Sequence, residues 1–274
     1  MFGKQTLREL SEATGKTKLG IKKSFKRITV PAKQHQPRTI NLVVDVSFFG
    51  KKETGQWGVL VFRDPVKSED LWWRFVDDEK LVHYLEGLVF LEQTGYEISS
   101  ITCDGFRGLL KIFNDYPVQF CHFHQKQIIR RYVTQNPRSI AGADLKEVVE
   151  MLGEVSKIEF TQYLKAYLNR YQTFLNEKTI NPLTGRSTFT HRRLRSAVRS
   201  LVTNLPHLFT YENYPHRKIP NTTNSLESHF SHIKDILRIH RGLTRSVKEK
   251  MIETILCNSS IVKPNKPESR DPKV

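Results

Sequence analysis

The chain has 274 residues, of which 38% are hydrophobic and 10% aromatic; this excludes a disordered polypeptide and predicts one large or two smaller folded domains. Lys and Arg outnumber Asp and Glu by 44 to 28, so the net charge of +16 favours a polyanionic partner such as nucleic acid over an ordinary basic enzyme. No apolar run approaches the roughly 18 residues of a membrane span, and the polar N-terminus has no signal core, so we expect no membrane partner. Three cysteines, an odd number, favour a reducing compartment.

The first forty residues carry ten basic and two acidic side chains, a net charge of 10 − 2 = +8. Apolar spacing over residues 5–28 predicts two short helices with a turn at Gly15. This pattern favours a helix-turn-helix over residues 1–30, with an ordinary basic helical hairpin as the alternative. Residues 31–38, which hold two prolines, are expected to be a linker. The basic side chains of the second helix suit DNA phosphates: Lys18, Lys22, Lys23, Lys26 and Arg27.

Residues 39–49 (TINLVVDVSFF) are β-branched and aromatic, which predicts a buried strand. Two more strands after short turns would complete an antiparallel meander. The order predicts an α/β fold, a mixed sheet flanked by helices. The elements expected next are strands at 56–63 and 71–76, a helix at 80–94, a strand at 98–103, a helix at 106–114 and a strand at 118–123.

The remainder of the chain has helical spacing from 124 to 205 and again from 223 to 238 and from 247 to 257. Residues 206–222 contain three prolines and are expected to be irregular. We therefore predict a catalytic domain over 39–260 with a helical insertion at about 125–215. The polar tail 261–274, rich in proline and lysine, is expected to be disordered.

Two aspartates lie within or at the end of apolar strands, where an ionised side chain is unfavourable. Asp45 lies between Val44 and Val46 inside the first strand, and Asp104 follows the strand 98–103. Carboxylates at such positions in one sheet can point into one cleft, where divalent cations relieve their repulsion. Oxygen ligands favour Mg²⁺, with Mn²⁺ as the alternative, and two such ions can perform in-line phosphoryl transfer.

Glu227 is the candidate third carboxylate, early on a helix that follows capping residues. Helical spacing would place it on one face with Ser231 and a basic stripe that could follow a DNA backbone. The alternative is a solvated helix face. The basic residues of the stripe are Lys234, Arg238 and Arg241.

Cys121 and His124 have a metal-ligand spacing, but no matching second pair is apparent, which favours a packed Cys121 and a hydrogen-bonded His124 over structural zinc. His124 begins the helix after the strand next to Asp104 and can therefore reach the same cleft.

These motifs together resemble the Mutator-like transposases and their bacterial insertion-sequence relatives. The resemblance covers about residues 40–245, and 227 − 104 = 123 positions separate the second acid from the third. The motifs are VVDVSFFG around Asp45, TCDGFRG around Asp104, QFCHFHQKQIIRR with Cys121 and His124, and NTTNSLES around Glu227.

The resemblance implies a ribonuclease-H-like core, an all-helical insertion before Glu227 and an Asp-Asp-Glu triad that holds two Mg²⁺ ions. It implies cleavage at element ends followed by strand transfer into target DNA. Cys121 and His124 would support the site or contact DNA, and the helix-turn-helix would bind terminal inverted repeats. The protein would act as a homodimer or larger assembly on double-stranded DNA, in the bacterial cytoplasm with the nucleoid.

The chain begins directly at the predicted helix-turn-helix, whereas many relatives have a longer N-terminal region; we expect a truncated copy or a shorter DNA-binding portion. Two alternatives remain at this stage. One is a catalytically inactive or domesticated DNA-binding protein that acts as a repressor. The other is a ribonuclease-H-like nuclease for a branched or hybrid nucleic acid.

Overall fold

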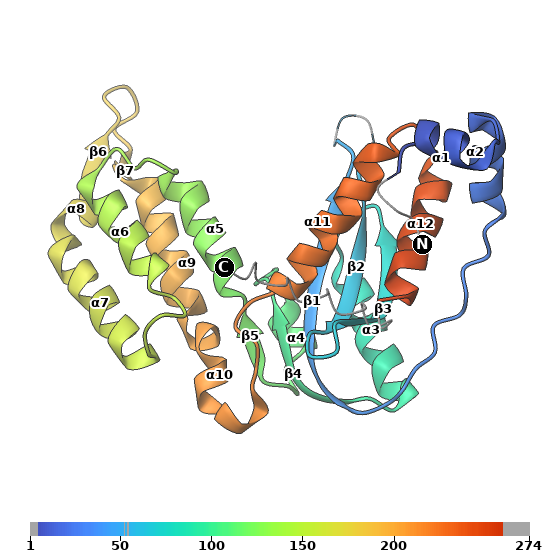
Figure 1. The fold of residues 1–274 in the computed structure, drawn as a ribbon. Coiled ribbons are helices and arrows are strands. Elements are labelled where there is room, and N and C mark those ends of the chain that lie inside the picture. Colours follow the sequence, from blue (N-terminus) through green and yellow to red (C-terminus); the bar gives the residue numbers. More distant parts are fainter. Residues whose placement is uncertain (1–4, 52, 54, 260–274) are drawn as a thin grey trace, which may run out of the picture.

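The structure is a computed structural model that describes residues 5–51, 53 and 55–259. It combines a five-stranded mixed sheet, covered by helices on both faces, with a mainly helical lobe beside the sheet (Figure 1). The α/β fold with a mixed sheet flanked by helices is therefore confirmed. The tail 261–274 lies outside the described residues.

The sheet has the strand order β3-β2-β1-β4-β5. The strands β1 (Thr39–Phe49), β2 (Trp57–Asp64) and β3 (Glu69–Val76) form the predicted antiparallel meander. On the other side of β1, the strands β4 (Glu97–Cys103) and β5 (Val118–Phe120) are added in parallel. The central strand β1 is thus the one at which pairing changes from antiparallel to parallel.

Alternate residues of the strands face two different cores, because side chains along a strand point to opposite faces. Leu42 and Val44 of β1 pack with α3 (Leu81–Thr94) and with Leu109 of α4 (Leu109–Ile112). Val43 packs instead with α11 (Asn224–Ile239) and α12 (Arg245–Cys257). Asp45 is two residues after Val43, and alternate residues of a strand point to the same face. Asp45 therefore lies on the face of the sheet that α11 covers.

The lobe begins at α5 (His122–Val133) and returns to the sheet before α11. Its core is continuous with the core on the α3 face of the sheet, through buried residues such as Ile129 and Phe209. The lobe contains α6 (Ile140–Glu150), α7 (Lys157–Arg170), α8 (Gln172–Asn176), β6 (Lys178–Ile180), β7 (Ser187–Phe189), α9 (Arg192–Leu208), α10 (Thr210–Asn213) and the 3₁₀ helix η2 (Pro215–Arg217).

The prediction of an all-helical insertion is wrong, because β6 and β7 form an antiparallel hairpin at the far tip of the lobe (Figure 1). Asn181 shapes its turn, since the side-chain oxygen accepts the backbone N–H groups of Leu183 and Thr184. Gly185 adopts the left-handed conformation at φ 65°, which the missing Cβ allows.

Other expected boundaries need correction. The strand expected at 118–123 ends at Phe120, and Phe123 belongs to α5. The helix expected at 106–114 is limited to α4. The segment 206–222 is less irregular than expected, because α9 continues through Pro206 to Leu208.

Two N-terminal helices are present as expected, α1 (Leu7–Thr14) and α2 (Lys18–Arg27), with Gly15 left-handed between them. Phe25 of α2 contacts the ring of His240 edge-on and packs against the cluster beneath α12. Lys250 of α12 also donates a hydrogen bond to the Lys26 carbonyl. The pair of helices therefore docks on the α11–α12 connection.

The segment 31–38 has no regular structure, as predicted for a linker, but it is fixed to the sheet. The ammonium group of Lys33 lies 2.7 Å from a carboxylate oxygen of Glu69, and Arg38 binds both Asp64 and Glu69. Within the part of the chain that the structure describes, no helix has the length and apolar character needed to cross a bilayer.

Candidate active site

The register of the two parallel strands β1 and β4 aligns Asp45 with Asp104. The parallel register pairs Val43 of β1 with Thr102 of β4, so two residues further on Asp45 lies beside Asp104. The hydroxyl of Thr102 donates to the carbonyl of Pro220, shortly before α11 begins. The face of β4 that carries Thr102 is therefore on the α11 side of the sheet. Asp45 thus lies on β1, and Asp104 comes directly after the last residue of the adjacent parallel strand β4.

The electrostatics of Asp45 show that this carboxylate is poorly compensated. Burial raises its pKa well above the ordinary value, and the charges of Asp104, Glu227 and Glu79 raise it further. The opposing influence is the backbone N–H of Val46, which donates to Oδ1 over 2.8 Å. A buried carboxylate among other acids favours either a proton or a cation.

Glu227 reaches this site from the first turn of α11, which Leu226 and Phe230 anchor against β1 and β2. Its side chain is about one quarter exposed. Burial raises its pKa, while His124, the Thr223 hydroxyl and Lys234 favour the charged form. Asp104, just after β4, and Glu227, on α11, thus both act electrostatically on Asp45 of β1.

The Cys121–His124 motif lies at the junction of β5 and α5, next to Glu227. The Nε2 atom of His124 is 3.9 Å from Oε1 of Glu227. Cys121 is buried, and burial raises the pKa of its thiol. Thr223 contacts all three side chains through its hydroxyl. It lies in the segment expected to cap the helix, but it makes no side-chain cap hydrogen bond.

Two residues near the site were not predicted. Glu79, in the loop between β3 and α3, has a pKa raised by burial and by the charge of Asp104, against the hydrogen bond it accepts from Tyr84. Glu79 follows two exposed aspartates in a polar loop, where nothing in the local pattern distinguishes it. Thr223 was not singled out either, because two of its partners, Cys121 and His124, are distant in the sequence.

Two ligand sets can be drawn around Glu227. The first is the set of carboxylate oxygens with Asp45 and Asp104, which suits a hard cation such as Mg²⁺ or Mn²⁺. The second is Cys121, His124 and Glu227, whose ligand atoms lie within 4.8 Å of one another and suit a softer ion such as Zn²⁺. Among the described residues, the three carboxylates do not come this close together; what relates Asp104 and Glu227 to Asp45 is the effect of their charges on its pKa.

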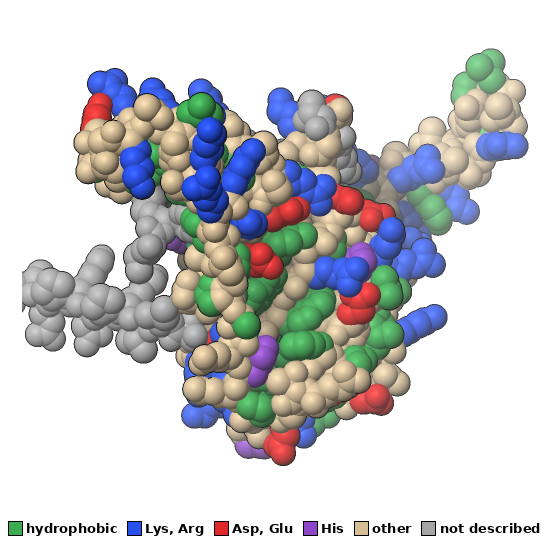
Figure 2. Space-filling model, turned by 90° about the vertical axis from the view of Figure 1, so that its right-hand side faces the viewer, with side chains coloured by type: hydrophobic (Ala, Val, Ile, Leu, Met, Phe, Trp, Pro, Cys, Tyr) green, Lys and Arg blue, Asp and Glu red, His purple; other side chains and the backbone are tan. Residues whose placement is uncertain are grey.

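The expected basic residues lie on two surfaces. Lys18, Lys23, Lys26 and Arg27 of α2 are exposed and Lys22 is half-buried; Figure 2 shows basic side chains gathered over the N-terminal helices at the top of this view. On α11, Lys234 and Arg238 are exposed, and Arg238 contacts Asp235 at 3.1 Å. The helix ends at Ile239, so Arg241 lies beyond the predicted helical face.

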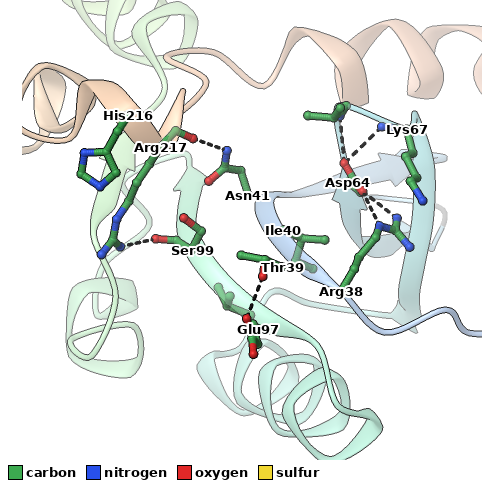
Figure 3. Close-up of a pocket in the computed structure, with 12 residues that line it drawn as sticks. Arg38, Thr39, Ile40, Asn41, Asp64, Lys67, Glu97, Ser99, His216 and Arg217 are labelled. Carbon is green, nitrogen blue, oxygen red and sulfur yellow. Dashed lines mark hydrogen bonds and ion pairs between the residues drawn. The ribbon is translucent and has the colours of Figure 1, made fainter.

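A pocket of about 620 Å³ lies at the opposite end of β1 and β4 from the carboxylates (Figure 3). Its polar groups are bonded to one another. Arg217 donates to the carbonyl of Ser99, Asn41 donates to the carbonyl of Arg217, and Thr39 donates to Glu97. These bonds attach the return of the lobe to the sheet and leave the carboxylate end as the candidate active site.

No protein-family model matches the chain, and a comparison with curated proteins gives no significant match.

Proposed function

We propose that this protein is a DNA transposase of the class formed by the Mutator-like enzymes and their bacterial insertion-sequence relatives. The observation that carries the proposal is that the charges of Asp104 and Glu227 both act on the buried Asp45 carboxylate. These are the three acids that the resemblance assigns to the catalytic triad. Their repulsion would be relieved by divalent cations.

The sheet also supports the proposal. A meander of three strands followed by two parallel strands, in the order β3-β2-β1-β4-β5, is compatible with the ribonuclease-H-like core that the resemblance implies. Asp45 lies on the central strand β1, and Asp104 follows its parallel neighbour β4, so the sheet itself brings these two acids to one edge. The long lobe between β5 and α11 corresponds to the proposed insertion.

Asp45, Asp104 and Glu227 would hold the metal ions, which when bound activate the attacking oxygen and stabilise the leaving oxygen in phosphoryl transfer. The chain itself contributes orientation. The strands fix the two aspartates, α11 fixes Glu227, and His124 beside Glu227 can exchange a hydrogen bond with the reacting DNA or with water. Lys234 and Arg238 lie further along α11 and would bind the phosphate backbone.

The two N-terminal helices would form the helix-turn-helix that recognises the ends of the element. Their exposed basic side chains on α2 favour this function. Because α2 docks near His240, at the end of the helix that carries Glu227, bound DNA would run from the recognition helices towards the acids.

The decisive experiment is a cleavage and strand-transfer assay with Mg²⁺ on a plasmid that carries the DNA flanking the gene. Asp104→Asn removes one metal ligand without changing side-chain volume, so we expect products to fall by at least about 100-fold. The matched control is Asp115→Asn, at an exposed aspartate in the turn before β5, which should keep full activity.

The outcome also separates the competing functions. Undiminished products with Asp104→Asn would refute the triad. Specific binding to the flanking DNA without any metal-dependent product would favour the repressor. Cleavage of branched or hybrid substrates in preference to the flanking DNA would favour a nuclease.

A further inference from the structure

Thr223 is completely buried at the point where the Cys121–His124 motif meets the helix that carries Glu227. Its hydroxyl oxygen lies 3.2 Å from Sγ of Cys121, 3.4 Å from Nδ1 of His124 and 3.2 Å from Oε1 of Glu227. Its backbone N–H also donates to Sγ of Cys121 over 3.2 Å. One residue therefore contacts all three members of the adjacent cluster.

The hydrogen-bonding capacity of a hydroxyl restricts how these contacts are made. A hydroxyl has one proton to donate and two lone pairs to accept with. An ionised Glu227 can only accept, so the Thr223 proton must be directed to it. The two remaining neighbours must then donate to the Thr223 oxygen, the thiol of Cys121 through S–H and the imidazole of His124 through Nδ1–H.

We propose that Thr223 is a positioning residue that holds neutral His124 in the Nδ1–H form and holds Glu227 in its site-facing orientation. This inference rests on the proposed function for its catalytic meaning, although the hydrogen-bond assignment stands without it. With the proton on Nδ1, the unprotonated Nε2 atom lies on the side of Glu227, at 3.9 Å from its oxygen. Nε2 is then the atom that accepts a hydrogen bond from water or from a reacting hydroxyl group.

The same junction closes the base of the lobe. Cys121 and Thr223 are 102 positions apart, at the two ends of the lobe, and the backbone N–H of His122 donates to the carbonyl of Asn221 beside them. A displacement of either end would move the partners of the Thr223 hydroxyl. The position of Glu227 is thereby tied to both connections between lobe and sheet.

The direct test is the ¹⁵N spectrum of the histidine side chains of the full chain, at about pH 9, where an ordinary imidazole is neutral. His124→Gln identifies the His124 signals. We expect the wild-type protein to carry the His124 proton on Nδ1. Thr223→Val should populate the Nε2–H form, and Thr223→Ser should retain the wild-type form because it keeps the hydroxyl.

The control variant is Thr222→Val, an equivalent replacement next door that leaves the hydrogen bonds of Thr223 in place. It should preserve the wild-type spectrum. The proposal is overturned if wild-type His124 is protonated on Nε2, or if Thr223→Val keeps the Nδ1–H form. One equivalent of bound Zn²⁺ that is lost in Cys121→Ser would also overturn it, since thiol and imidazole would then be ligands. The wild-type spectrum alone gives an answer should Thr223→Val not fold.

A second measurement tests the effect on Glu227. Calorimetric titration with Mn²⁺ should give an affinity about 10-fold lower in Thr223→Val than in wild type, with Thr223→Ser close to wild type. Unchanged Mn²⁺ affinity in a folded Thr223→Val protein would contradict the positioning of Glu227. An inactive wild-type protein would refute the transposase but leave both the tautomer and the affinity comparison valid, so the two proposals fail separately.

Discussion

The sheet carries two acidic clusters that are built in opposite ways. At the start of β1, Asp64 and Glu69 are buried, but Arg38 binds both and Lys33 binds Glu69. We call these four residues the paired cluster. Although burial raises the pKa of Glu69, hydrogen bonds from the two cations outweigh it and lower the pKa overall.

The second group, here the carboxylate cluster, consists of Asp45, Asp104, Glu227 and Glu79. Its members raise the pKa of Asp45, and Asp104 raises that of Glu79. The comparison teaches how to separate two uses of buried acids. An acid whose charge is matched by the chain stabilises the fold, whereas a buried acid left unmatched favours either a proton or a cation from outside.

The largest expected effect is in the paired cluster. Arg38→Met keeps much of the side-chain stem but leaves Asp64 without its partner in a buried position, so we expect a loss of about 3–5 kcal/mol in the free energy of unfolding, measured by urea denaturation. Arg74→Met removes an exposed ion pair with Glu86 and should cost less than about 1 kcal/mol. Equal losses of unfolding free energy in Arg38→Met and Arg74→Met would contradict the stabilising function of the paired cluster.

The next effect is stabilisation by metal. Mn²⁺ at about 100 times its dissociation constant should stabilise the wild-type protein by about 2.7 kcal/mol, because it binds the folded site and not the unfolded chain. Asp45→Asn should abolish most of this gain, since it removes a ligand from the carboxylate cluster. Thermal unfolding with and without Mn²⁺ measures both; a full gain in Asp45→Asn would place the ion elsewhere.

A smaller effect is expected for Asp45→Asn without metal. The asparagine oxygen can still accept the Val46 N–H, while the buried charge and its repulsion disappear. We therefore expect this variant to be more stable than wild type by about 1 kcal/mol in chelator at neutral pH. Destabilisation would mean that Asp45 is compensated in the metal-free protein.

The smallest effect is the dependence of stability on pH, where the two clusters should differ in sign. The pKa of Asp45 is raised from 3.8, so its contribution is greatest below that value and declines as the pH rises towards the raised pKa. The pKa of Glu69 is lowered from 4.5, so its contribution is complete above 4.5 and is lost as the pH falls through the lowered pKa.

Comparison of wild type with Asp45→Asn and with Glu69→Gln across pH 3–7 would isolate each contribution. Each single proton can contribute a slope of at most about 1.4 kcal/mol per pH unit. If the stability difference between wild type and Asp45→Asn and that between wild type and Glu69→Gln changed with pH in the same direction, the opposite pKa shifts of the two acids would be contradicted.

Where the local pattern is strong, the sequence was sufficient to predict the structure. Residues 39–49 form β1 with the predicted bounds, since an unbroken β-branched run has few alternatives in a buried sheet. The hairpin at the lobe tip was missed because its strands have three residues each, although Asn181, Pro182 and Gly185 were available as turn signals.

The candidate site divides in the same way. Asp45 and Asp104 could be predicted because the strands fix their position along the sheet and the face to which their side chains point. Glu79 and Thr223 could not, because the importance of each depends on what packs around it. Two of the three partners of the Thr223 hydroxyl, Cys121 and His124, are about one hundred positions distant, which no local pattern contains.

The continuous core of lobe and sheet has a consequence for cooperativity. Ile129 of α5 and Phe209 at the end of α9 are fully buried in the same cluster as Leu42 of β1. Excision of residues 125–215 would open the α3 side of the sheet to water, so the remainder should not fold independently. Calorimetry should accordingly detect a single transition in which lobe and sheet melt together, with equal calorimetric and van't Hoff enthalpies.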